Sequence, residues 1–282
     1  MPAMKLSGHL AKMHTALADP VQYTLPLDDA RIPLNPLLGR PLRITHSGAI
    51  HCIHCGRATR KSFAQGYCYP CFTRLAQCDT CIVRPEQCHY AAGTCREPDW
   101  AADHCFRPHV VYLANASGLK VGITRASQLP TRWLDQGASQ ALPVLEVRSR
   151  HLSGLVEVAC KAHVSDRTQW QRMLKGEPQP LDLPARRDDL LARIAPTLDA
   201  LRAEHGDDAV TALPAAEPVA IRYPVRQWPA KVRALNLDRE PEVRGTLLGI
   251  KGQYLILDSG VLNIRKYGGY HVTVESDALA AA

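Results

Sequence analysis

The cysteines of this chain are the residues best able to bind a metal. Ten cysteines occur in 282 residues, and nine of them lie between Cys52 and Cys105. Two Cys-x2-Cys pairs are separated by twelve residues. Two such pairs allow four thiolates to meet around one tetrahedral ion, with each sulfur about 2.3 Å from the metal. The sequence therefore predicts a structural zinc site of the zinc-ribbon type, with the ligands Cys52, Cys55, Cys68 and Cys71.

A second, more loosely spaced cysteine group follows the first. It contains more thiols and imidazoles than one tetrahedral ion needs. Its predicted ligands are Cys81, Cys88, Cys95 and Cys105, with Cys78 or His89 as substitutes. Zinc is the favoured metal, and an iron–sulfur cluster stays open as the alternative because four thiolates hold it equally well. The clustering of the thiols indicates metal binding in a reducing compartment rather than a secreted disulfide framework.

Composition and charge restrict the class of protein. The chain is 46% hydrophobic and 22% charged, as soluble globular proteins usually are. It contains no apolar run of about 18 residues, and its first residues have no clean apolar core of a signal peptide. We therefore expect a cytoplasmic protein without a membrane partner. A net charge of +7 and a pI near 8.9 favour a polyanionic partner such as nucleic acid, although a merely basic protein would show the same values.

Basic and aromatic side chains alternate with the predicted metal ligands. Together they would supply phosphate contacts and surfaces for base stacking. The alternative is a solvated face whose aromatic rings pack the small core. The turns near the C-terminus carry further cations that could extend the same surface. The residues predicted to contact nucleic acid are Arg57, Lys61, Arg74, Arg125, Lys251, Arg265 and Lys266.

The elements that must position these side chains predict an α+β protein. Residues 1–50 are typical of β strands, and residues 51–109 hold the two cysteine groups. Residues 110–175 alternate strand, strand, helix, strand and helix, which indicates a small three-stranded α/β domain. Residues 176–240 contain one helix, expected over 188–206, and a Pro-rich connection. Residues 241–276 alternate in the manner of a small antiparallel barrel-like domain, which the N-terminal strands could complete.

Within 110–175 the expected elements are more specific. Residues 110–114 and 119–124 form a predicted hairpin, and residues 129–137 a short helix that begins at Pro130 and ends near Gly137. Residues 142–150 are the third strand. Residues 154–174 are expected to be one amphipathic helix.

The hairpin carries a recognisable pattern. VVY ends at Tyr112, a short turn follows, KVG begins at Lys120, and Arg132 comes on the next helix. This order resembles the GIY-YIG endonuclease superfamily, in the branch whose second tripeptide begins with lysine. The resemblance implies that two strands carry the tripeptides, that the next helix supplies an arginine, and that a later helix supplies a metal-binding glutamate.

The resemblance assigns roles to four residues of this chain. Tyr112 matches the tyrosine that positions or activates the attacking water, and Lys120 takes the place of the second tyrosine. Arg132 matches the arginine that stabilises the phosphate, and Glu157 matches the ligand of Mg²⁺ or Mn²⁺. Gly122 would let the strand approach the substrate closely. The first tripeptide lacks its glycine and the second its tyrosine, and these departures leave the activity of such a site open.

A second resemblance covers most of the chain. The stretches GTCREPDW, VVYLA, KVGITR and PTRWLDQGA resemble a prokaryotic family, domain of unknown function 2797, which implies the same architecture and no particular activity. Two functions therefore remain as hypotheses. One is a zinc-binding, nucleic-acid-binding protein whose GIY-YIG-like domain hydrolyses phosphodiesters. The other is a non-enzymatic adaptor that binds nucleic acid, a ribosome or a protein partner. The sequence does not distinguish DNA from RNA.

Overall fold

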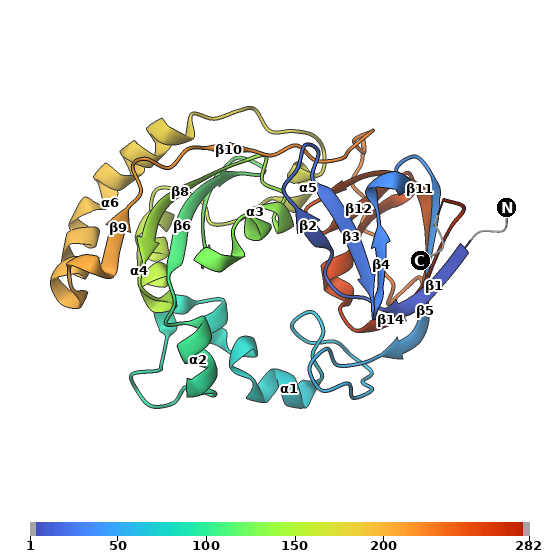
Figure 1. Ribbon diagram of the computed structural model, residues 1–282, viewed down its shortest axis with the longest axis horizontal. Helices are drawn as coiled ribbons and strands as arrows, with labels where there is room; N and C mark the ends of the chain where they lie inside the picture. Colours follow the sequence, from blue (N-terminus) through green and yellow to red (C-terminus); the bar gives the residue numbers. More distant parts are fainter. Residues whose placement is uncertain (1–3, 279–282) are drawn as a thin grey trace.

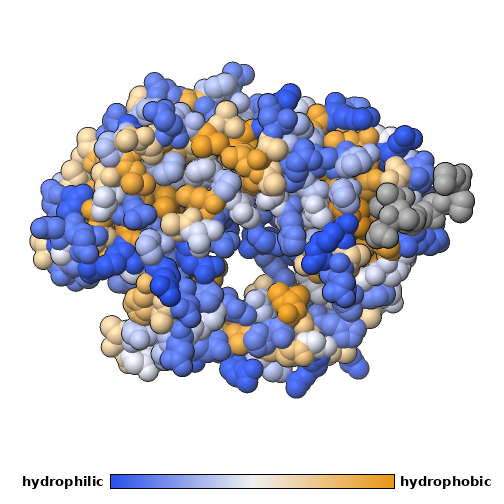
Figure 2. Space-filling model, viewed as in Figure 1, coloured by the Kyte–Doolittle hydropathy of each residue, from blue (hydrophilic) through white to orange (hydrophobic). Residues whose placement is uncertain are grey.

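Three parts of the chain surround a central opening. The computed structural model describes residues 4–278. Figure 1 shows a lobe of strands drawn from both ends of the chain, a second lobe in which helices cover a sheet, and a connecting segment with little regular structure. We call these the β lobe (4–50 and 221–278), the α/β lobe (109–220) and the cysteine segment (51–108). The space-filling view leaves a gap between the three (Figure 2).

The β lobe contains an antiparallel six-stranded sheet made from both chain ends. In spatial order its strands are β1 (Met4–His9), β14 (Tyr270–Ser276), β5 (Pro41–Ile50), β11 (Glu242–Lys251), β12 (Tyr254–Leu257) and β13 (Gly260–Asn263). N-terminal strands thus do complete the C-terminal sheet. The barrel-like closure expected from the sequence is absent, since within residues 4–278 this sheet runs from β1 to β13 without closing.

A smaller sheet covers the apolar face of this lobe. It consists of β2 (His14–Ala16), β3 (Gln22–Leu27) and β4 (Ala30–Pro33), and β3 contacts β1. Side chains along β14 alternate between buried and half-buried, as a strand with one apolar face requires. Most buried side chains of both sheets form one core with those of the 3₁₀ helices η1 (Asn35–Leu37) and η7 (Ile264–Tyr267), whereas Ile256 and Val261 belong to a separate cluster.

The α/β lobe is built on a five-stranded sheet. The predicted hairpin is present as β6 (His109–Asn115) and β7 (Leu119–Arg125), and β8 (Gln140–Val147) pairs with the other edge of β6. The sequence predicted only these three strands. Two short strands, β9 (Val210–Ala212) and β10 (Val219–Ala220), add to the free edge of β8 at its two ends. They come from the stretch that was expected to be a helix and a Pro-rich connection.

Strand β6 is buried on both faces, which explains its continuous apolar run. Val111 and Leu113 belong to the core that the sheet shares with its helices. Tyr112 and Ala114, on the opposite face, belong to the core that extends into the β lobe. Alternate residues of one strand therefore join the two lobes, because successive side chains of a strand point to opposite faces.

The helices of the α/β lobe differ from the prediction over residues 154–174, and the helix predicted over 188–206 begins earlier, at Leu183. Their bounds are η5 (Ala126–Gln128), α3 (Thr131–Asp135), α4 (Arg150–Lys161), α5 (Trp170–Met173), α6 (Leu183–His205) and η6 (Asp207–Ala209). The single helix predicted over 154–174 is wrong. Helix α4 ends at Lys161, and the carbonyl of Ser165 accepts the N–H of Val121 at 2.8 Å, so this stretch serves as a partner for β7.

The cysteine segment has only short helices. They are α1 (Tyr69–Arg74), η2 (Ala76–Cys78), η3 (Thr80–Ile82), η4 (Pro85–Gln87) and α2 (Pro98–His104). Such short elements bury little apolar surface, so bound metal would have to supply much of the folding energy of this segment. Among the described residues, no helix combines the length and the hydropathy that crossing a membrane requires.

Candidate metal centres and a basic cleft

The first four cysteines come together as the sequence predicts. The sulfur atoms of Cys52, Cys55, Cys68 and Cys71 all lie within 4.8 Å of one another. The Sγ atoms of Cys55 and Cys68 are 3.8 Å apart. Thiolates held about 2.3 Å from one tetrahedral zinc ion stand about 3.8 Å apart, so the four sulfurs have the spacing of a zinc site.

The local backbone explains this convergence. A tight turn brings the N–H of Gly56 to the carbonyl of Cys52 at 2.9 Å, and α1 starts directly after Cys68. Burial opposes ionisation of Cys52, but backbone N–H groups of Cys55, Cys68 and His54 donate to its sulfur and lower its pKa to about 6. Burial and the neighbouring cysteines raise the pKa of Cys71 to about 12, so the four sulfurs do not ionise equally, and a bound cation would stabilise all of them as thiolates.

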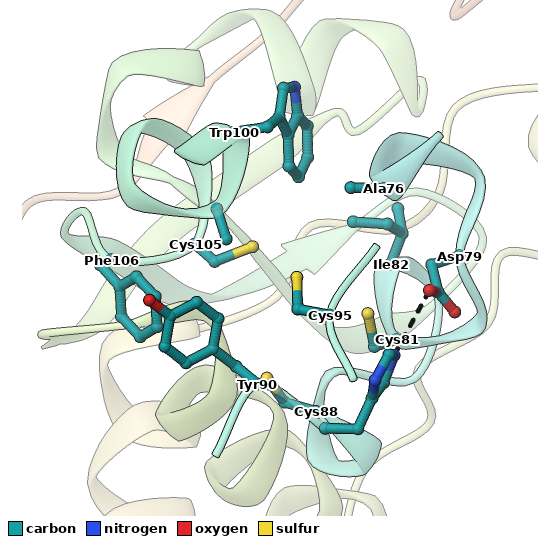
Figure 3. Close-up of a pocket in the computed structure, with 12 residues that line it drawn as sticks. Ala76, Asp79, Cys81, Ile82, Cys88, Tyr90, Cys95, Trp100, Cys105 and Phe106 are labelled. Atoms are coloured by element: carbon teal, nitrogen blue, oxygen red, sulfur yellow. Dashed lines mark ion pairs between the residues drawn. The ribbon is translucent and has the colours of Figure 1, made fainter. Parts of the chain in front are cut away.

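The second cysteine group surrounds a small cavity. Its lining includes all four of the predicted ligands, together with His89 and the rings of Trp100, Tyr90 and Phe106. In Figure 3 the four cysteine side chains are gathered around this shared space: Cys81, Cys88, Cys95 and Cys105. Cys78, the proposed substitute, is not part of this lining and packs against the first cysteine group instead.

A cleft of about 460 Å³ lies where the three parts of the molecule meet. The β lobe contributes Lys12 and Arg265, and the cysteine segment contributes Ile82, Val83 and Pro85. The α/β lobe contributes the largest share, which includes Arg125, Arg132, Asp135, Arg150 and Glu157. We call it the basic cleft, because five cationic side chains and only two carboxylates line it.

Two of the four residues assigned by the GIY-YIG resemblance line the basic cleft. Arg132 comes from α3 and Glu157 from α4. Burial raises the pKa of Glu157, although Lys161 one turn later pairs with it at 3.4 Å and opposes this shift. The carboxylate therefore faces the cleft with a single cationic partner among the described residues.

The other two residues lie next to the cleft without lining it. Tyr112 has no exposed surface, and its hydroxyl donates to Oε1 of Gln136 at 3.0 Å. A Cβ atom on Gly122 would come within 2.6 Å of that hydroxyl, so the glycine makes room for the phenol rather than for a substrate. Lys120 is 4% exposed, and burial together with the nearby Arg132 lowers its pKa to about 8.

The residues predicted to contact nucleic acid do not lie on one surface. Arg125 and Arg265 line the basic cleft, whereas Arg57, Lys61 and Arg74 are exposed on the cysteine segment. Lys266 is exposed, pairs with Asp238 at 3.4 Å and lines a different hollow of the β lobe.

Lys251 cannot serve as a surface contact, and this prediction is wrong. Its side chain is fully buried. Its Nζ lies 3.1 Å from Glu177 and 3.2 Å from the hydroxyl of Ser139, over the ring of Trp228. The turn after β11 looked exposed in the sequence, but it docks against the α/β lobe, and Lys251 joins the two lobes there.

Two residues of the basic cleft, Lys12 and Arg150, were not among the residues predicted from the sequence. Lys12 lies in a short N-terminal connection, where it pairs with Asp135 at 2.8 Å across 123 positions of sequence. Arg150 is the first residue of α4 and has no motif around it. Only the folded arrangement of the three parts could have identified them.

Within the described part of the chain, four arginines of the basic cleft have no carboxylate partner. Among residues 4–278, Arg125, Arg132, Arg150 and Arg265 form no ion pair within 4.0 Å. Burial and the neighbouring guanidinium of Arg132 lower the pKa of both Arg150 and Arg265. The four groups therefore repel one another across the cleft, and a bound anion would relieve that repulsion.

Comparisons with known proteins give one family. The model of a family described as "Protein of unknown function (DUF2797)" matches residues 39–272. No curated protein and no solved structure matches the chain. The match begins before the first cysteine pair and ends within β14, so it spans both cysteine groups and every residue of the basic cleft except Lys12.

Proposed function

The chain belongs to the DUF2797 family, and because that description assigns no activity, we propose a function from the site: this is a zinc-binding protein that holds a nucleic-acid strand in the basic cleft. One observation carries the proposal. Four arginines that have no carboxylate partner in residues 4–278 converge on one cleft. Partly buried guanidinium groups without a counter-ion are costly, and phosphate groups satisfy their remaining N–H groups with bidentate hydrogen bonds.

The size of the cleft favours a single strand over a duplex. Pockets of about 300–1,000 Å³ enclose ligands of the size of small molecules. A cleft of about 460 Å³ therefore accommodates a phosphodiester with its neighbouring nucleosides. Its neighbours Trp133 and Tyr112 are buried, so recognition rests on the phosphate backbone more than on base stacking.

The first cysteine site has a structural role in this proposal. The hairpin between its two cysteine pairs contains Gln65, whose Oε1 accepts a hydrogen bond from Nε of Arg265 at 2.7 Å. The chain just before the first cysteine pair is also joined to the β lobe, because the N–H of His51 donates to the carbonyl of Gly269 at 2.8 Å. A zinc ion at this site would therefore hold Arg265 in its place at the cleft.

Phosphodiester hydrolysis is a second candidate function. It is favoured by the presence of Arg132 and Glu157 in one cleft, because the reaction needs a cation near the developing charge and a ligand for a divalent ion. Mg²⁺ or Mn²⁺ bound at Glu157 would activate water. Tyr112 has no access to solvent, so its part would be limited to supporting Gln136 and the adjoining Arg132.

Binding of labelled oligonucleotides, followed by fluorescence anisotropy at several salt concentrations, tests the proposal. Single-stranded RNA, single-stranded DNA and duplexes are compared. We expect the plot of log Kobs against log salt to be less steep for Arg132→Ala and for Arg265→Ala than for the wild type. The magnitude of its negative slope should fall by about 0.7 in each variant for a single strand. Arg193→Ala is the matched control, because Arg193 is exposed on α6 and paired with Asp189. Equal binding by all three variants and the wild type would overturn the proposal.

A further inference from the structure

We propose that the second cysteine cavity holds a 4Fe–4S cluster, with Cys81, Cys88, Cys95 and Cys105 as its four ligands. This cavity adjoins the basic cleft, and the proposed cluster does not depend on nucleic-acid binding there. It rests on how the sulfurs are spaced, on what surrounds them, and on what the neighbouring polar groups already bind.

The spacing of the sulfurs differs between the two cysteine groups. At the first site four sulfurs lie within 4.8 Å of one another, as one tetrahedral ion demands. Of the four thiols around the second cavity, only Cys81 belongs to a group that meets this limit, and its companions there are Asp79 and His89. A cubane cluster attaches each thiolate to a different iron, so its sulfurs stand farther apart than those on a single ion.

The surroundings of the cavity suit a cluster. Its lining is largely apolar, with Ile82, Ala76 and Trp100 on its walls and the rings of Tyr90 and Phe106 closing one side (Figure 3). The two rings pack edge to face with their centroids 4.6 Å apart. An apolar shell limits the access of solvent and oxidants to a cluster and helps to set its potential.

A single ion on Asp79, Cys81 and His89 fits the contacts less well. Oδ2 of Asp79 is already bound by Nε of Arg96 at 2.8 Å, and it lies 3.3 Å from Nε2 of His89. A metal at this position would compete with the guanidinium of Arg96 for the same carboxylate oxygen. Such a site would also leave the other three thiols around the cavity without a role.

The charge around the cavity also favours a cluster with four thiolates, which is anionic overall. Arg150 begins the helix beside the cavity, and its guanidinium donates to the carbonyl of Ile82. Its backbone N–H donates to the carbonyl of Cys105 at 2.7 Å. A cation fixed beside the thiolates stabilises their negative charge in a site of low dielectric.

The test is the metal and sulfide content of the full-length protein purified without oxygen. We expect about four irons and four acid-labile sulfides per chain beside one zinc, with the visible absorption of a cluster that bleaches on reduction. Protein stripped of metal and then treated with ferrous iron and sulfide should regain that spectrum. Two zinc ions per chain and no cluster after this treatment would overturn the proposal, and two irons with two sulfides would contradict the cubane.

Matched variants assign the ligands. Cys88→Ser and Cys95→Ser should lose the iron and keep the zinc. Cys78→Ser and Cys160→Ala are the controls, since Cys78 lies outside the cavity and Cys160 is buried in the core of the α/β lobe. Circular dichroism checks that each variant is folded. Retention of all four irons by both ligand variants, or loss of iron from both controls, would contradict the assignment.

Discussion

The backbone N–H of Arg150 donates to the carbonyl oxygen of Cys105 at 2.7 Å, so a residue of the basic cleft is fixed to a residue of the second cysteine cavity. Ile82 strengthens this link, because its side chain lines both the cavity and the cleft. The two sites therefore share a wall. If the cysteine segment becomes disordered, the residues of this wall should move and change the shape of the cleft.

We expect that loss of the second metal site weakens nucleic-acid binding. Cys88→Ser removes a proposed ligand without touching the cleft, and disorder of the shared wall should displace Arg150. A coupling of about 1–3 kcal/mol corresponds to about 5- to 150-fold in affinity. Anisotropy with the same oligonucleotide measures the change, with Cys78→Ser as the control. An unchanged affinity in a variant that has lost its iron would show that the two sites are independent.

Glu157→Gln separates binding from hydrolysis. The substitution removes one of two carboxylates from a cleft that carries five cations, so binding of a single strand in the absence of divalent metal should become tighter. If the cleft also hydrolyses its ligand, the same variant should lose cleavage in Mg²⁺ or Mn²⁺, because the carboxylate is the proposed metal ligand.

The control for Glu157→Gln is Glu204→Gln, at an exposed residue of α6 outside the cleft. Cleavage is followed on gels with end-labelled RNA and DNA. If Glu157→Gln binds more tightly and the wild type cleaves neither RNA nor DNA, the protein binds nucleic acid without hydrolysing it. Weaker binding by Glu157→Gln would contradict the place given to this carboxylate in the cleft.

The sequence could predict what depends on local spacing. Two Cys-x2-Cys pairs specify a tetrahedral site by themselves, because each pair forms one tight turn and a hairpin brings the turns together. The hairpin of β6 and β7 could also be predicted, from its two apolar runs and the turn between them. The predicted order of strand, strand, helix, strand and helix is observed from β6 to α4, although the last helix is shorter than predicted.

What depends on contacts between distant segments could not be predicted. The basic cleft collects Lys12, Arg132 and Arg265 from three separate stretches, and no periodicity connects them. Lys251 was predicted to be exposed because it lies next to a turn, but the contact between the two lobes buries it. The β8 edge strands were missed for a similar reason, since two- and three-residue strands are specified by their partner rather than by their own residues.

Tyr112→Phe tests whether the phenol has more than a packing role. The variant loses the hydrogen bond to Gln136 in a buried setting, which should lower the free energy of unfolding by about 1 kcal/mol. Tyr223→Phe is the matched control, because its buried hydroxyl donates to the carbonyl of Ala138 at 2.9 Å. Urea unfolding should give similar losses for both. If Tyr112→Phe loses cleavage but keeps its binding affinity, the phenol does take part in the reaction.

His109 should make the stability of the fold sensitive to acid. The imidazole at the start of β6 is fully buried, and burial, with Arg150 and Arg125 nearby, lowers its pKa to about 4. In the unfolded chain it titrates near its ordinary pKa of about 6.5. Between these values the unfolded state binds more protons, so the free energy of unfolding falls as the pH drops from about 6.5 to about 4, by on the order of 3 kcal/mol.

His109→Gln removes this titration and should flatten the pH dependence over that window. Urea unfolding at several pH values measures the difference between the variant and the wild type. The difference is the relevant quantity, because metals bound by thiolates dissociate in the same pH range in both chains. His14→Gln, at an exposed position in β2, is the control that should follow the wild type. Parallel curves for His109→Gln and the wild type would mean that the buried imidazole is charged in the folded state, which would require an anionic partner beside Arg125 and Arg150.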